Sequence, residues 1–203
     1  KIINDGTSYK GSLLIEGEKI SKIFRDNIPD SVLKNATVIG ADGKWVLPGV
    51  IDTHVHFREP GLTEKGDFES ESRAAVAGGV TTVFDMPNTN PQTTTSALVE
   101  QKAEIASKKC LTNYGFYIGA TNDNVDEIKN IDPKSVAGVK IFMGISTGGM
   151  LVNSKQSLED IFASAKVPVV THNEDEAMIK ANTEAIKAKY PEGQVPISEH
   201  MFI

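Results

Sequence analysis

The sequence lacks three features that would point to a secreted, membrane-bound or nucleic-acid-binding protein. Cys110 is the only cysteine among 203 residues, so no intrachain disulfide can form and a reducing, cytoplasmic setting is favoured. No apolar run approaches the roughly 20 residues that a membrane-spanning helix needs. Basic residues form no stripe and are outnumbered, 21 against 27 acidic residues, for a formal net charge of -6. This balance argues against nucleic acids and anionic membranes as partners.

Two parts with different patterns divide the sequence, residues 1–44 and residues 45–203. The first part predicts a small all-β piece, with a strand at Ile2-Ile3, a hairpin around Gly17 and a turn at Asp42-Gly43 between strand-like runs. The second part alternates strands with helices. We expect strands at 45–56, 80–85, 111–118, 136–142 and 167–171, helices at 67–77, 94–108, 124–130, 154–165 and 174–189, and a glycine-rich loop at 144–149.

The alternation in the second part predicts an α/β fold with a parallel sheet and right-handed crossovers. A closed (β/α)8 TIM-type barrel takes about 250 residues, and this part supplies roughly five-eighths of that length. We therefore predict an incomplete (β/α)8 barrel of about five βα units. An open doubly wound sheet is the alternative. The barrel is favoured because polar residues follow successive strands, at the ends where barrel sites are built.

A pair of histidines, His54 and His56, closes the first expected strand of the barrel. Residues 45–52 before them are apolar and predict a buried strand, and a Pro-Gly break lies just beyond them. Alternate residues of a strand face the same way, so both rings can converge on one cation. The alternative is two histidines on a solvated strand edge. The neighbouring Arg58 and the polar residues of later strands favour the metal.

Two later residues, Lys140 and His172, extend the metal hypothesis to other strands. Lys140 stands in a run that should be buried, where an unpaired ammonium is costly. It therefore needs an ion-pair partner, a shifted pKa or a chemical modification. A neutral lysine can add CO2, and the oxygens of the resulting carbamate can bridge two divalent cations. His172 follows the fifth expected strand, and its alternative is a polar strand end beside a helix cap.

Imidazole nitrogen and carboxylate-like oxygen together suit zinc. Two such ions would lower the pKa of a shared water and polarise a carbonyl group, which predicts hydrolysis of an amide or a related bond. Arg58 has a planar fork that suits a carboxylate, and Asn88 can add an amide donor to the same group. Together they suggest an anionic substrate. The alternatives are a surface salt bridge of Arg58 with Glu59 or Glu64 and an Asx-turn at Asn88.

Four motifs resemble those of the dihydroorotases in the amidohydrolase superfamily. They are PGVIDTHVHFREPG at 48–61, DMPNTNP at 85–91, GVKIFMG at 138–144 and THNE at 171–174. The similarity covers the whole chain, because residues 1–44 resemble a portion of the small β-sandwich that flanks such barrels. The combination of the first two motifs is specific.

The resemblance implies a zinc enzyme that interconverts N-carbamoyl-L-aspartate and L-dihydroorotate in pyrimidine synthesis, and a homodimer. His54 and His56 would bind one Zn2+, and carboxylated Lys140 would bridge it to a second Zn2+ that His172 also binds. Arg58 and Asn88 would hold the substrate carboxylate.

The family also needs a histidine after the sixth strand, as a metal ligand, and an aspartate after the eighth, as metal ligand and general base. Both are expected beyond Ile203, and His200 does not stand at a ligand position. We therefore interpret the 203 residues as the N-terminal part of a longer enzyme, inactive alone and without a general base of its own.

Three other functions stay open at this point. Allantoinases and dihydropyrimidinases share the lysine at position 140 but usually lack an arginine at position 58, so allantoinase is the alternative enzyme. A non-catalytic dihydroorotase-like subunit, partnering for example an aspartate carbamoyltransferase, is the second alternative. A plain α/β binding domain with incidental histidines is the third.

Overall fold

The computed structural model describes residues 1–144 and 149–202. The chain divides into two compact units, Lys1–Val50 and Ile51–Ile203. The predicted domain boundary between residues 44 and 45 remains a prediction. No helix among the described residues is both long enough and apolar enough to cross a membrane.

The first unit consists of two short hairpins and one helical turn. Strands β1 (Ile2–Asn4) and β2 (Thr7–Tyr9) pair antiparallel, as do β3 (Ser12–Glu16) and β4 (Lys19–Phe24), and α1 spans Asp30–Leu33. The strand at Ile2 and the hairpin around Gly17, which has a φ of 62°, are confirmed.

The predicted turn at Asp42-Gly43 is confirmed, but the strand-like runs on either side of it form no hairpin. The turn forms, with the Lys44 N–H donating to the Ala41 carbonyl at 3.1 Å. The strand-like runs on either side do not pair with each other, because Val46 instead makes a parallel bridge with Ile2. The residue pattern predicted the turn, but it did not predict that Val46, after the turn, would pair with Ile2.

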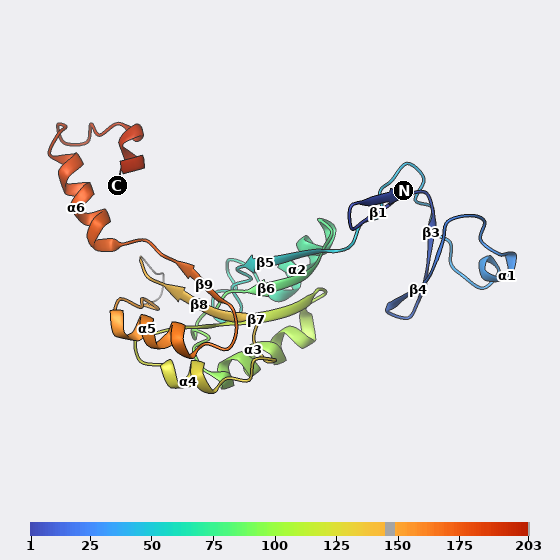
Figure 1. Cartoon of the computed structure of the whole chain (residues 1–203), viewed down its shortest axis with the longest axis horizontal. Helices are drawn as coiled ribbons and strands as arrows, with labels where there is room; N and C mark the ends of the chain where they lie inside the picture. Colours follow the sequence, from blue (N-terminus) through green and yellow to red (C-terminus); the bar gives the residue numbers. More distant parts are fainter. Residues whose placement is uncertain (145–148, 203) are drawn as a thin grey trace. The chain divides into compact units, whose positions relative to one another are not determined.

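The second unit contains a five-stranded sheet with the spatial order β5-β6-β7-β8-β9 (Figure 1). The registers recorded for β6 to β9 are all parallel. Because the strands lie in chain order, each crossover steps in the same direction, as in a barrel; a doubly wound sheet reverses its order. The predicted incomplete (β/α)8 barrel is confirmed. Its strands are β5 (Val50–Val55), β6 (Val80–Asp85), β7 (Asn113–Gly119), β8 (Gly138–Phe142) and β9 (Val169–His172).

A helix follows each strand of the sheet, as predicted. Four of the helices begin after a side chain that accepts the backbone N–H three residues on, which satisfies an otherwise unpaired donor; these caps are Asp67, Thr95, Ser154 and Asp175. The helices are α2 (Phe68–Ala77), α3 (Ser96–Lys109), α4 (Val125–Asn130), α5 (Lys155–Ser164) and α6 (Glu176–Lys187), and a final 3-10 helix spans Ile197–Phe202. The predicted glycine-rich loop at 144–149 falls largely outside the described residues.

The hydrophobic core of the second unit lies between the sheet and the helices on its convex face, among them α3, α4 and α5 (Figure 1). The first strand departs from expectation here. Val50 and Ile51 were expected to be buried, yet they are 53% and 58% exposed, because β5 is an outermost strand of the sheet. The most deeply buried core residues include Phe68, Val83, Ile118, Ile128, Val139, Ile141 and Ile161.

Candidate metal centre

The two histidines of the first barrel strand come together at its C-terminal end. His54 is in β5 and His56 follows it, and their ring centroids are 5.3 Å apart. Two imidazoles on one tetrahedral zinc, each with a Zn–N distance near 2.0–2.1 Å, would place their ring centroids about 5 Å apart. The pair therefore has a separation that fits one shared ion.

His172, at the end of the fifth strand, approaches this pair from the opposite edge of the sheet. Its ring centroid lies 5.9 Å from that of His54. In a flat sheet β5 and β9 would lie about 19 Å apart, since neighbouring strands are about 4.8 Å apart. The sheet is therefore strongly curled, and its concave face brings residues of the first and fifth strands into one place. The His172 ring packs edge-on against the Phe142 ring, with the two ring centroids 5.2 Å apart.

Lys140 lies in β8, the strand next to β9, and is only 1% exposed. Its Nζ is 4.8 Å from the centroid of the Phe142 ring, and no hydrogen bond or ion pair reaches it from the described residues. The ion pair considered from the sequence is therefore not formed there. Burial lowers the pKa of Lys140, and the charge of Glu174 opposes this only in part. A larger share of the amine is consequently neutral than in an exposed lysine.

The electrostatics of the histidines agree with this placement. Burial lowers the pKa of His54, and the charges of Lys140 and His172 lower it further. Burial, then the charge of Arg58, lowers the pKa of His56, while a hydrogen bond with the Asn88 side chain opposes this. Both imidazoles thus favour the neutral form, which is the form that binds a metal.

A cavity of about 790 Å3 opens beside these residues. Four of the predicted site residues line it: His56, Arg58, Asn88 and His172. The described lining holds two cations, Arg58 and Lys65, and no aspartate or glutamate, although the whole chain is acidic. Sequence reasoning missed Lys65, because nothing in the pattern of the loop that carries it indicates where the side chain goes.

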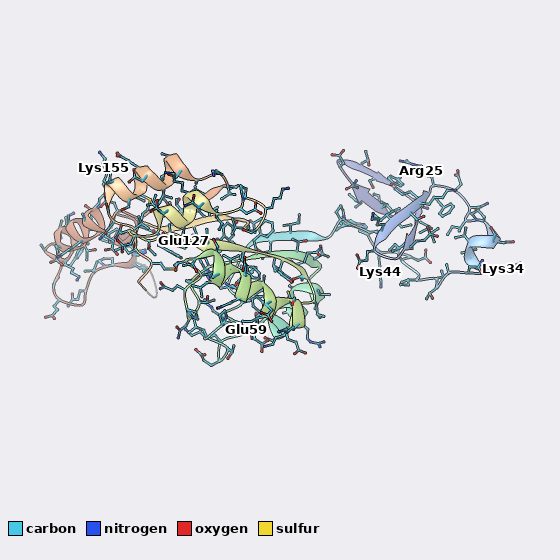
Figure 2. All side chains as sticks on the ribbon, turned by 90° about the horizontal axis from the view of Figure 1, so that it is seen from below. Arg25, Lys34, Lys44, Glu59, Glu127 and Lys155 are labelled. Atoms are coloured by element: carbon cyan, nitrogen blue, oxygen red, sulfur yellow. The ribbon has the colours of Figure 1, made fainter. Side chains whose placement is uncertain are left out.

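Arg58 is held in an uncommon backbone conformation, with a φ of 70°. Within the described residues no carboxylate forms an ion pair with it. Glu59, labelled in Figure 2, pairs instead with Lys109 at 2.5 Å and accepts the Phe68 N–H at 3.1 Å, so this glutamate ties the loop to α2 and α3. The alternative of a salt bridge between Arg58 and Glu59 is therefore wrong, and the guanidinium remains available to the cavity.

A buried ion pair between Asp85 and Lys102 was also missed. Their side chains are each 1% exposed, and Asp85 Oδ2 lies 2.5 Å from Lys102 Nζ. The signal was present in the sequence: Lys102 lies between Val99 and Ala106 at helical spacing, on the face of α3 that packs into the core. A lysine on such a face has to find a partner.

In the part of the chain that the structure describes, no three histidine, cysteine, aspartate or glutamate side chains are grouped so that they could hold a metal ion. The three imidazoles alone are thus an incomplete donor set. Lys140 is the additional side chain that the strands bring beside His54, and as an amine it would have to be modified to supply an oxygen.

Comparison with known proteins gives one family. The model of the amidohydrolase family matches residues 45–195. A dihydroorotase of Methanosarcina acetivorans is 41% identical over 182 residues, which are 88% of this chain and 38% of that protein. An L-hydantoinase of Paenarthrobacter aurescens is 33% identical over 192 residues, 92% of this chain and 41% of that protein. The chain thus spans about two fifths of the length of these relatives.

Among solved structures, the L-hydantoinase (dihydropyrimidinase) of Arthrobacter aurescens superposes with a TM-score of 0.78. The two proteins are 30% identical, and the match covers 95% of this chain and 42% of the other. The fold and the sequence therefore point to the same group of proteins.

Proposed function

The chain belongs to the amidohydrolase family, and from that premise we propose that it is the N-terminal part of a zinc-dependent hydrolase of cyclic amides. More narrowly, we propose a dihydroorotase, which interconverts N-carbamoyl-L-aspartate and L-dihydroorotate in pyrimidine synthesis. The observation that carries the proposal is the convergence of three imidazoles from the first and fifth strands on a buried lysine with a lowered pKa.

In this proposal His54 and His56 hold one zinc ion, and His172 contributes to a second. Lys140 would contribute to both sites as a carbamate: its neutral Nζ would bond to the carbon of CO2 and release one proton, and the product would carry one negative charge. The change turns an ammonium that is costly to bury into an anion that the cations neutralise. When bound, the zinc ions would lower the pKa of a water molecule and polarise the amide carbonyl of the substrate.

The charge of the cavity supports an anionic substrate. Arg58 and Lys65 line it without a compensating carboxylate among the described lining residues. Both dihydroorotate and carbamoyl aspartate carry a carboxylate that the guanidinium of Arg58 can bind through two parallel hydrogen bonds. Asn88, whose side chain hydrogen-bonds with His56, would contact the same group. The ring substrates of hydantoinases, allantoinases and dihydropyrimidinases need no such anion site.

A hydantoinase or dihydropyrimidinase is the second candidate, because relatives with those names match the chain closely in sequence and fold. The deciding test uses the full-length protein. Metal content is measured on the purified protein, and hydrolysis is assayed with dihydroorotate, hydantoin, dihydrouracil and allantoin under identical conditions. We expect about two zinc ions per chain and turnover of dihydroorotate.

Preference for an uncharged ring would refute the narrower proposal but keep the wider one. Absence of both metal and turnover would favour the non-catalytic subunit instead. The 203-residue chain alone is expected to show no turnover, and turnover by it would contradict the proposed dependence on later residues.

A further inference from the structure

A chain of buried polar contacts joins helix α3 to the strand end that carries the metal-binding histidines. Lys102 Nζ pairs with Asp85 Oδ2 at 2.5 Å and donates to the Met86 carbonyl at 2.8 Å. The other oxygen of that carboxylate, Asp85 Oδ1, accepts the Phe57 N–H at 2.7 Å. The Met86 N–H donates to the Val55 carbonyl at 3.0 Å. These contacts, called the clip below, tie the end of β6 to Val55 and Phe57 at the end of β5.

The clip can affect the site because of where Phe57 lies in the sequence. Phe57 stands between His56 and Arg58, the proposed metal ligand and the proposed carboxylate anchor. Its backbone N–H is held by a carboxylate, and hydrogen bonds to charged groups are shorter and stronger than neutral ones. Its side chain is 5% exposed and packs edge-on against Phe68. Backbone and ring are thus both fixed, and the residues on either side have little freedom to turn.

Lys102 is what allows a carboxylate to be charged at this depth. Both side chains are 1% exposed, and a buried charge without its partner is unfavourable. If the ammonium is removed, the Asp85 carboxylate loses its only ion-pair partner among the described residues and is no longer held in place, which weakens its hydrogen bond to the Phe57 N–H. Lys102 therefore acts on the site through Asp85 and the backbone, without lining the cavity itself.

We propose that Lys102 is a positioning residue: by holding the Asp85 carboxylate against the Phe57 N–H, it fixes the strand end that orients His56 and Arg58. The effect on metal and substrate binding rests on the proposed function. The effect on the Phe57 amide does not, and this difference makes the two separable.

The test compares four variants of the full-length protein: Lys102→Met, Asp85→Asn, the double variant, and Ile128→Ala as a control. Ile128 lies in the same core on α4 and is fully buried, and the ion pair and hydrogen bonds that link Lys102, Asp85, Met86, Val55 and Phe57 do not involve it. The control therefore lowers stability without removing a polar partner of Lys102 or Asp85. Two quantities are measured: hydrogen exchange of the Phe57 amide in metal-free protein, relative to the Val139 amide of β8, and the dissociation constant for Zn2+ by competition with a chelator.

In Lys102→Met we expect the Phe57 amide to exchange at least tenfold faster relative to Val139, and zinc to bind at least tenfold more weakly. The Ile128→Ala control should change neither ratio. The double variant should recover part of both losses, because a neutral asparagine still offers an oxygen to the Phe57 N–H and needs no cation. Asp85→Asn alone should lie between Lys102→Met and the double variant, both in the exchange ratio and in the dissociation constant for zinc.

Two results would overturn the proposal. One is an unchanged Phe57-to-Val139 exchange ratio in Lys102→Met, whatever the zinc result. The other is faster exchange at Phe57 with zinc affinity equal to that of the control, which would leave the clip a purely structural device. If the unsubstituted protein binds no zinc, the proposed function fails, and the exchange ratio still decides whether the lysine fixes this strand end.

Discussion

Replacing Gly61 with alanine tests whether the loops after the first two barrel strands touch backbone to backbone. Gly61 has a φ of 83°, and an added Cβ would overlap the carbonyl oxygen of Asn90 and lie 2.7 Å from its carbonyl carbon. The neighbouring Asn90 N–H donates to the Pro60 carbonyl at 3.1 Å. The two loops are therefore in direct contact, with no room for a methyl group.

The expected cost of Gly61→Ala has two parts. A left-handed conformation costs an alanine about 1–2 kcal/mol, and relieving the overlap by shifting a backbone segment adds about 1–3 kcal/mol. The free energy of unfolding should thus fall by roughly 2–5 kcal/mol. Gly79→Ala is a matched control, because Gly79 has a φ of 87° but nothing within 4 Å of its added Cβ. It should lose only the conformational part, about 1–2 kcal/mol.

The assay is denaturant unfolding of both variants in the full-length, zinc-free protein, with KM for dihydroorotate measured on the zinc-loaded forms. Because Arg58 belongs to the displaced loop, KM should rise in Gly61→Ala and stay unchanged in Gly79→Ala. Equal losses of unfolding free energy in the two variants would show that the loops are not in contact, and the placement of Arg58 would lose its support.

Three further predictions concern charged residues, two in the proposed site and one in the loop beside it. Arg58→Met should raise KM for dihydroorotate about ten- to hundredfold, since a charged hydrogen bond contributes about 1.5–3 kcal/mol; hydrolysis of an uncharged ring by the same variant, which should change little, is the comparison. Lys140→Met should lower the zinc content to one ion or fewer per chain while raising the unfolding free energy of the zinc-free protein, because a buried ammonium is removed; a destabilised apo-variant would contradict this. The hydrogen bond to Glu59 raises the pKa of Lys109 above 10.5, so the stability that this pair contributes is fully present below pH 10.5 and is lost as the pH rises through the raised value. The difference in unfolding midpoint between the unsubstituted protein and Lys109→Met should therefore shrink above that pH, and a constant difference would rule the pair out as its source.

Local signals predicted most of the second unit. The capping residue Asp67 and the Gly78-Gly79 stop delimit α2 in the sequence as they do in the structure. The strand β6 has the predicted bounds, because an apolar, β-branched run lies between those glycines and the Pro87 that follows. The site residues could likewise be proposed from their place at strand ends, where a barrel brings its chemistry together.

What the sequence could not supply depends on neighbours. The apolar residues of β5 predicted burial, but burial of a strand is decided by what lies beside it, and β5 is an outer strand of the described sheet. Val46 found its partner in Ile2, more than forty positions earlier. The helical spacing of Lys102 with Val99 and Ala106 indicates a buried face, but only the packing of α3 against the sheet identifies Asp85 as its partner.

The curl of the sheet has a consequence for how the protein acquires its shape during synthesis. His54 and His56 leave the ribosome more than one hundred residues before His172, whose ring lies against that of His54 in the finished fold. Until β9 docks, a divalent ion can meet only the early pair, on a strand that is still free to rearrange. Contacts between residues so distant in sequence form slowly, so at the proposed zinc site tight ion capture would belong to the last stages of maturation, and a nascent chain released early would be a weak chelator.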